Sequence, residues 1–97
     1  MKKILAVDDR ANSLKVLAAI LRDEGYEVLQ ASSGDKALNI YASSSDIDVV
    51  LSDLKMPGMD GLELFRRMNA MMKAPPFVIM TAYGTVKSAV EALKEGV

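Results

Sequence analysis

The chain of 97 residues contains no cysteine and no histidine. The absence of cysteine excludes disulfides, thiolate nucleophiles and zinc sites built from thiolates. The absence of histidine removes imidazole bases, histidine metal ligands and a phosphorylated histidine from the available chemistry. Any reaction that this chain carries out must therefore use carboxylate, hydroxyl and amine groups.

The sequence also lacks a dominant charge and a long apolar run. Twelve basic and thirteen acidic residues leave a net charge of −1, which does not favour binding to nucleic acid or to a membrane surface. The apolar runs are far too short to span a bilayer, and residues 1–3 lead into a strand pattern rather than into a signal peptide. We therefore expect a cytoplasmic protein that binds neither a membrane nor nucleic acid directly.

Apolar and polar residues alternate in blocks typical of one small α/β domain over residues 1–97, of which 51% are hydrophobic. Short apolar runs predict strands at 2–8, 26–31, 48–54 and 77–81. Helical spacing predicts a helix after each strand, within residues 12–25, 35–41, 62–72 and 85–96. This alternation predicts a doubly wound parallel sheet with helices on both faces, joined by right-handed crossovers.

Particular residues mark the ends and the buried faces of these helices. Asn12 or Ser13 is expected to cap the first helix and Gly25 to end it, and Ser33 is expected to cap the second. In the third helix, the spacing predicts a buried face formed by Leu62, Phe65, Met68 and Met72. Most of the methionines are expected at core positions, namely Met56, Met59, Met68, Met71, Met72 and Met80.

Three acidic residues follow two of the predicted strands. Asp8 and Asp9 follow the apolar run 4–7, and Asp53 follows the run 49–52. In an open parallel sheet the ligand site lies beyond the carboxyl ends of the strands, so neighbouring strands would bring the three carboxylates together. Carboxylates that crowd together repel one another unless they bind a hard cation or take up a proton. The pattern therefore predicts a cation site.

A pair of acids at the end of a strand is, taken alone, more typical of a solvated turn. The third acid and the turn-rich sequence Lys-Met-Pro-Gly-Met-Asp-Gly at 55–61 favour a functional site instead. In these features the chain resembles, over essentially its whole length, the receiver domain of bacterial two-component response regulators. The matching motifs are Val7-Asp8-Asp9, Leu51-Ser52-Asp53-Leu54, Met56-Pro57-Gly58-Met59-Asp60-Gly61 and Thr81-Ala82. The stretch 81–86 is most similar to receivers attached to nitrogen-regulation-type, enhancer-binding transcription activators.

The resemblance implies a flavodoxin-like fold with strand order 2-1-3-4, and a signalling domain rather than an enzyme. Asp53 would be the phosphoacceptor, which takes a phosphoryl group from a histidine kinase or a phosphotransfer protein. Asp9 and Asp53 would hold Mg²⁺, with Asp8 acting largely through water and the backbone carbonyl of Lys55 as a further ligand. Thr81 would be the switch hydroxyl, which relays the signal to a DNA-binding output domain that this chain does not contain.

The chain ends at Val97, whereas a complete receiver continues into a fifth strand and a fifth helix. In the family, the fifth strand carries a lysine that pairs with the phosphoryl group and an aromatic switch residue. Lys55 and Lys87 are the nearby candidates to replace that lysine. Without the fifth unit, the fourth strand would form an apolar edge beside an uncovered part of the sheet. Such an edge favours association, so we expect the chain to self-associate there.

Other functions remain open. A Mg²⁺-dependent phosphohydrolase with an aspartate nucleophile is one alternative, although such enzymes usually carry a second acid where this chain has Lys55. A fragment that only binds a partner, with phosphorylation impaired by the missing lysine, is another. Nucleotide binding is disfavoured, because residues 9–12 lack the glycines that let a backbone approach a pyrophosphate.

Overall fold

The computed structural model describes residues 2–44, 46–53, 56–71 and 76–80. These ranges contain four strands and three helices, which alternate along the chain as expected. The predicted helix after Thr85 lies outside the described residues, as do Lys55, Thr81 and Lys87. None of the three described helices has the length and the apolar character needed to cross a bilayer.

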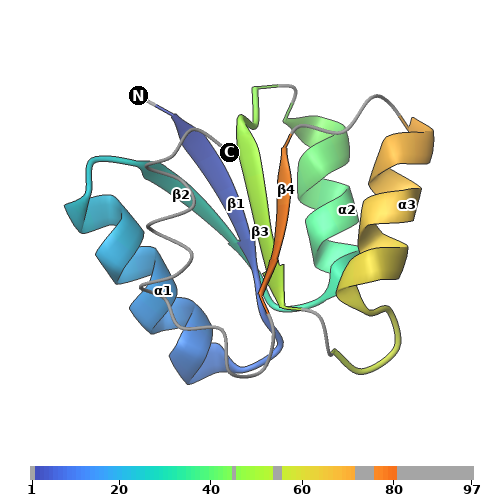
Figure 1. Ribbon diagram of the computed structural model, residues 1–97, viewed down its shortest axis with the longest axis horizontal. Coiled ribbons are helices and arrows are strands. Elements are labelled where there is room, and N and C mark those ends of the chain that lie inside the picture. The colour runs from blue at the N-terminus through green and yellow to red at the C-terminus, as the bar shows by residue number, and fades with distance from the viewer. Residues whose placement is uncertain (1, 45, 54–55, 72–75, 81–97) are drawn as a thin grey trace.

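The four strands form one parallel sheet in the order β2-β1-β3-β4, which confirms the predicted doubly wound α/β fold (Figure 1). Each neighbouring pair of strands in this sheet is parallel. β1 and β3 therefore occupy its centre. The bounds of the strands are β1 Lys3–Val7, β2 Glu27–Ala31, β3 Val49–Asp53 and β4 Phe77–Met80.

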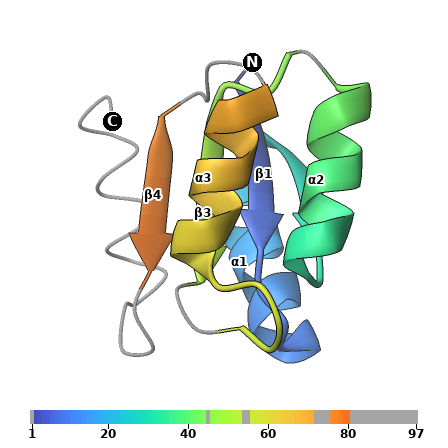
Figure 2. The same ribbon diagram turned by 90° about the vertical axis from the view of Figure 1, so that its right-hand side faces the viewer.

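Helices cover both faces of the sheet. α1 (Ala11–Asp23) lies on one face (Figure 1). α2 (Gly34–Ser43) and α3 (Gly61–Met71) lie side by side on the other face (Figure 2). The result is a three-layer arrangement in which both central strands are covered on both faces, as expected for a parallel sheet.

Two hydrophobic cores, one on each face, hold the central strands in place. Along β1, Ile4 and Ala6 are buried in the core under α1, whereas Leu5 and Val7 are buried in the core under α2 and α3. This alternation is what a strand covered on both faces requires. Each of the four residues has an exposed fraction of 0%. A shift of β1 by one residue would therefore exchange its two buried faces.

The start of α1 differs from the prediction. Asn12 and Ser13 lie inside the helix, and its N-cap is Arg10, whose side chain makes no capping hydrogen bond. The Asp8 carboxylate explains the earlier start, because its Oδ1 accepts from the backbone N–H of Arg10 at 2.9 Å and holds the turn between β1 and α1. At the other end, Gly25 has a φ of +94°, which confirms its role as the residue that ends the helix.

The buried face of α3 also differs from the prediction. Met68 is buried, but Leu62 and Phe65 are 44% and 37% exposed. The buried residues of α3 are instead Gly61, Leu64 and Met68. Both sets of residues recur at helical spacing, so periodicity alone does not distinguish them. The position of α3 against the sheet and α2 selects the face that is buried.

Methionines anchor the loop that follows β3. Met56 and Met59 have exposed fractions of 8% and 7% and belong to the core under α2 and α3. Met68 is buried in the same core, whereas Met71 is 47% exposed, so the expectation of a core position is wrong for Met71. Met72 lies outside the described residues. The two loop methionines hold this loop against the sheet close to the end of β3.

Charged groups hold the opposite end of β1. The Lys3 ammonium lies 2.6 Å from an Asp46 carboxylate oxygen and 3.2 Å from a Glu27 carboxylate oxygen. The backbone N–H of Lys3 donates to the Asp48 carboxylate at 2.8 Å. The hydrogen bond between Lys3 and Asp46 lowers the pKa of Asp46 from its usual 3.8 and raises the pKa of Lys3 from 10.5. Both groups are therefore charged at neutral pH, and they tie β1 to β2 and to the segment before β3.

α2 begins where the sequence predicted, and its first residue approaches the methionine loop closely. Ser33 caps the helix, since its Oγ accepts from the backbone N–H of Lys36 at 3.2 Å. Gly34 follows the cap. A Cβ built on Gly34 would lie 2.7 Å from Met59 Sδ and 3.0 Å from Met59 Cβ. A larger residue here would therefore force the Met59 side chain to shift from its position against α2.

Gly34→Ala tests this close approach. We expect the free energy of unfolding to fall by about 1–3 kcal/mol, because the added methyl group overpacks the contact with Met59. Asn39→Ala, at an exposed position of the same helix, is the control and should change it by less than about 0.5 kcal/mol. Urea denaturation followed by circular dichroism measures both values. If the Gly34→Ala variant is as stable as the unmodified chain, then Met59 and its loop can shift without loss of stability.

Candidate functional site

The pairing of β1 with β3 positions the acidic residues. Val7 lies opposite Ser52 in the last pair of this ladder. Asp8 and Asp53 each come one residue after that pair, on neighbouring strand ends. The backbone N–H of Asp8 also donates to the carbonyl of Ala31 at 3.1 Å, which extends the pairing with β2 to this residue. The backbone at Asp8 is thus paired with β2, and the backbone at Asp53 is paired with β4, which holds both carboxylates in place.

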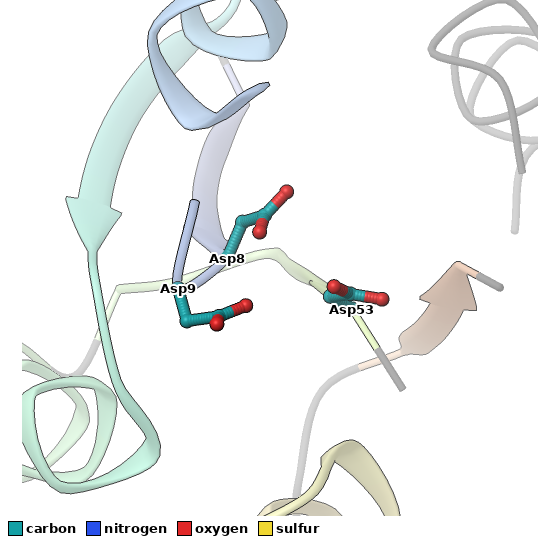
Figure 3. Close-up of side chains that lie close together, drawn as sticks. All are labelled: Asp8, Asp9 and Asp53. Atoms are coloured by element: carbon teal, nitrogen blue, oxygen red, sulfur yellow. The ribbon is translucent and has the colours of Figure 1, made fainter. Parts of the chain in front are cut away.

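Asp8, Asp9 and Asp53 come together at the carboxyl ends of the central strands β1 and β3 (Figure 3). Each offers a carboxylate oxygen, and these oxygens lie within 4.8 Å of one another. Asp8 and Asp53 are buried, each with an exposed fraction of 4%, whereas Asp9 is exposed. The cluster therefore has two buried acids and one acid that faces solvent. A hydrated cation can approach the cluster from the side of the exposed acid.

A basic side chain lies against the two buried acids. The Nε of Arg10 is 3.6 Å from Asp8 Oδ1, and its Nη2 is 3.7 Å from Asp53 Oδ2. The backbone N–H of Arg10 donates to the same Asp8 Oδ1. Because the Arg10 side chain is 56% exposed, it partly neutralises the two acids from the solvent side.

The donor set of the cluster suits a hard divalent cation. Its three ligand groups are carboxylates, and the chain has no histidine or cysteine to offer nitrogen or sulfur. Mg²⁺ prefers oxygen ligands, keeps several waters and is usually held by one or two carboxylates. Zn²⁺, Cu and Ni²⁺ sites favour imidazole or thiolate ligands, whereas carboxylate oxygens and water suit Mg²⁺, Ca²⁺ and Mn²⁺. The residues present therefore fit Mg²⁺.

The structure thus places three of the predicted site residues in one cluster and leaves two outside the described ranges. Lys55 and Thr81 are the two that lie outside. Asp53 pairs with Met80 of β4, and Thr81 is the next residue in the sequence. The individual roles of these residues stay predictions.

The sequence motifs did not identify Arg10 as a site residue. The cations considered from the sequence were Lys55 and Lys87, both outside the described residues. The available signal was the position of Arg10 directly after the acidic pair. A residue in the turn between a parallel strand and its helix lies over the carboxyl end of the sheet, where ligands bind.

The fold and the acidic cluster agree with a comparison against known protein families. The family described as the response regulator receiver domain matches residues 4–97. The chain therefore belongs to the response regulator receiver domain family. This membership confirms the family resemblance carried by the acidic pair, the loop after β3 and the sequence at 81–82.

Two curated relatives are named as transcriptional regulatory proteins. ZraR of Escherichia coli strain K12 is 44% identical over 93 residues, which cover 96% of this chain and 21% of ZraR. GlrR of the same strain is 39% identical over 94 residues, which cover 97% of this chain and 21% of GlrR. The chain thus spans about a fifth of the length of the curated relatives it matches. Their names agree with the predicted similarity to receivers of transcription activators.

Solved structures of similar fold include two of the response regulator TrrA from Thermotoga maritima. In complex with Mg²⁺-BeF, TrrA is 35% identical with a TM-score of 0.79, and the match covers 96% of this chain and 80% of TrrA. In complex with the histidine kinase ThkA, the matched chain is 38% identical with a TM-score of 0.78, covering 88% of this chain and 72% of that one.

Binding of Mg²⁺ to the acidic cluster is directly measurable. We expect Asp9→Asn to weaken Mg²⁺ binding by roughly tenfold or more, because a neutral amide replaces a charged ligand. Asp23→Asn makes the same change at an exposed residue at the end of α1 and should leave the affinity unchanged. Isothermal titration calorimetry at constant ionic strength gives both affinities. Equal affinities for the unmodified chain and Asp9→Asn would remove Asp9 from the ligand set.

Proposed function

We propose that this chain is a phosphoacceptor signalling domain of a two-component system. In this proposal Asp53 accepts a phosphoryl group from a histidine kinase in a Mg²⁺-dependent reaction. The observation that carries it is the position of Asp53, which is buried at the carboxyl end of β3 with oxygens of Asp8 and Asp9 within 4.8 Å. Membership of the receiver domain family supports it.

In the proposed reaction, a carboxylate oxygen of Asp53 attacks the phosphorus of a phosphohistidine in line with the leaving nitrogen. A P–O bond forms while the P–N bond breaks, and the electron pair of the P–N bond stays on the imidazole nitrogen, which takes up a proton. A carboxylate is a weak nucleophile, but this donor is already activated. Pairing of Asp53 with Met80 across β3 and β4 helps to hold the nucleophile in position. The acyl phosphate product is labile, which suits a transient signal.

Mg²⁺ bound at the site would offset negative charge on the transferring group. We assign Asp9 and Asp53 as its carboxylate ligands, Asp8 as a ligand through water, and the backbone carbonyl of Lys55 as a further ligand. The contacts of Asp8 support the indirect role, because its Oδ1 already accepts from the backbone N–H of Arg10 at 2.9 Å. TrrA, which has a similar fold, was solved with Mg²⁺-BeF.

We also assign Thr81 as the switch hydroxyl, which donates a hydrogen bond to a phosphoryl oxygen on Asp53. Its support is its place in the sequence, directly after Met80, the residue that pairs with Asp53. The upstream partner would be a histidine kinase, as for TrrA with ThkA, or a phosphotransfer protein. The domain would act in the cytoplasm. The downstream partner would be a DNA-binding output domain, since ZraR and GlrR are named transcriptional regulators.

Treatment with Mg²⁺ and acetyl phosphate tests the phosphoacceptor. We expect intact mass spectrometry to show one phosphoryl group on the unmodified chain and none on Asp53→Asn. Asp60→Asn is a matched control, because asparagine can keep the cap of α3, where Asp60 Oδ1 accepts from the backbone N–H of Glu63 at 2.8 Å. Thr81→Ala should still accept the phosphoryl group but lose the NMR shifts that phosphorylation causes in the unmodified chain.

Other outcomes of this experiment favour the alternatives. Repeated turnover of phosphate esters that depends on Asp53 would indicate a phosphohydrolase. The absence of both Mg²⁺ binding and modification would indicate a domain that only binds a partner. Modification of Asp53→Asn to the same extent as the unmodified chain would contradict the assignment of the phosphoacceptor.

Self-association through β4 is the remaining part of the proposal. β4 is the last strand of the described sheet, and Phe77, Val78 and Ile79 on it are only partly buried. A partly exposed apolar edge strand can pair with a second copy of the chain. Light scattering over a dilution series should therefore show an average mass that rises with concentration. A constant monomer mass at all concentrations would contradict this part.

A further inference from the structure

Arg10 has no part in the proposed phosphoryl transfer, yet its side chain bridges the two buried acids of the site. Its Nε lies 3.6 Å from Asp8 Oδ1 and its Nη2 lies 3.7 Å from Asp53 Oδ2. Both acids are thus joined through one guanidinium group. A guanidinium carries its positive charge at every physiological pH, so Arg10 attracts these two acids whenever they are ionised.

The negative charge of the cluster favours a positive side chain beside it. Three carboxylates bring three negative charges within 4.8 Å, and two of them belong to buried residues. Such a group is costly unless positive charge lies beside it. Arg10 supplies one positive charge beside Asp8 Oδ1 and Asp53 Oδ2, and both residues belong to the acidic cluster that the proposed ion would occupy.

We propose that Arg10 is a resident counter-ion of the metal-free site and competes with Mg²⁺ for the carboxylates of Asp8 and Asp53. This inference rests on the Mg²⁺ site of the proposed function. It adds a residue that sets the affinity for the ion without being one of its ligands.

The geometry suits a side chain that leaves when the ion arrives. The two guanidinium contacts are longer than hydrogen bonds, and the Arg10 side chain is 56% exposed, so its displacement costs little. The backbone N–H of Arg10 donates to Asp8 Oδ1 at 2.9 Å, and this bond does not need the side chain. The guanidinium can therefore move into solvent while the turn that orients Asp8 is retained.

Titration of Mg²⁺ into Arg10→Gln and into the unmodified chain tests the competition. Loss of one positive charge beside the ion should tighten Mg²⁺ binding by about 3- to 10-fold at low ionic strength, with a smaller gain in high salt. Arg10→Lys keeps the charge and should bind Mg²⁺ like the unmodified chain. Arg67→Gln is the matched control, because Arg67 is 54% exposed and pairs with Glu63 of α3 at 3.7 Å instead of with the acidic cluster. Its Mg²⁺ affinity should be unchanged.

Two further measurements do not depend on activity. In EDTA, Arg10→Gln should melt at a lower temperature than the unmodified chain, and saturating Mg²⁺ should reduce that difference because the ion then neutralises the acids. Arg67→Gln should change the melting temperature equally in both conditions. In the unmodified chain, the Nε–H resonance of Arg10 should shift with Mg²⁺ at the same midpoint as the backbone resonances. This last readout applies even if Arg10→Gln does not fold.

The outcomes separate the inference from the proposed function. Mg²⁺ binding by the unmodified chain with equal or weaker binding by Arg10→Gln would overturn the inference and leave the proposed function in place. An Arg10 resonance that does not respond to bound Mg²⁺ would do the same. Tighter binding by Arg67→Gln to the same degree would show a general charge effect and would also overturn the inference. Failure of the unmodified chain to bind Mg²⁺ would overturn the proposed metal site and the competition with it.

Discussion

Parallel pairing of β1 with β3, from Ile4 opposite Val49 to Val7 opposite Ser52, sets where each strand leaves the sheet. Both strands lie at its centre, where the helices bury them on both faces. Asp8 and Asp53 come directly after the last of these pairs, so the register of one ladder makes them neighbours. A slip by one residue would turn the apolar side chains of β1 toward the wrong cores, which ties the register to hydrophobic burial. The two hydrophobic cores therefore determine the relative positions of Asp8 and Asp53, although neither acid belongs to a core.

The same register brings like charges together at a buried position. Asp8 and Asp53 are each only 4% exposed, so water by itself screens their repulsion poorly. In the proposed function, this repulsion is also the source of the affinity of the cluster for a hard cation. A counter-ion held as tightly as a buried salt bridge would cancel that affinity. In our proposal, Arg10, which is more than half exposed, partly neutralises the acids while leaving them open to exchange with an ion.

Sequence patterns succeeded where one local rule decides the outcome. The Ser33 cap, the glycine that ends α1 and the strands at the apolar runs depend on neighbours within a few residues. The patterns failed where two local rules compete. In α3, Leu62 and Phe65 recur at helical spacing as regularly as Leu64 and Met68, and only packing against the sheet and α2 selects the second pair. The start of α1 was misplaced because it depends on a hydrogen bond to the end of the preceding strand.

The sequence by itself determined the order of strands and helices and the identity of the acidic residues, and through its motifs the family, because these depend on residue type and local periodicity. Only the tertiary structure decided that oxygens of Asp8, Asp9 and Asp53 lie within 4.8 Å of one another and that Arg10 lies against two of them. The physical reason is that these distances follow from pairing between strands far apart in the chain. The place of a charged side chain is then set by the charges that folding gathers around it.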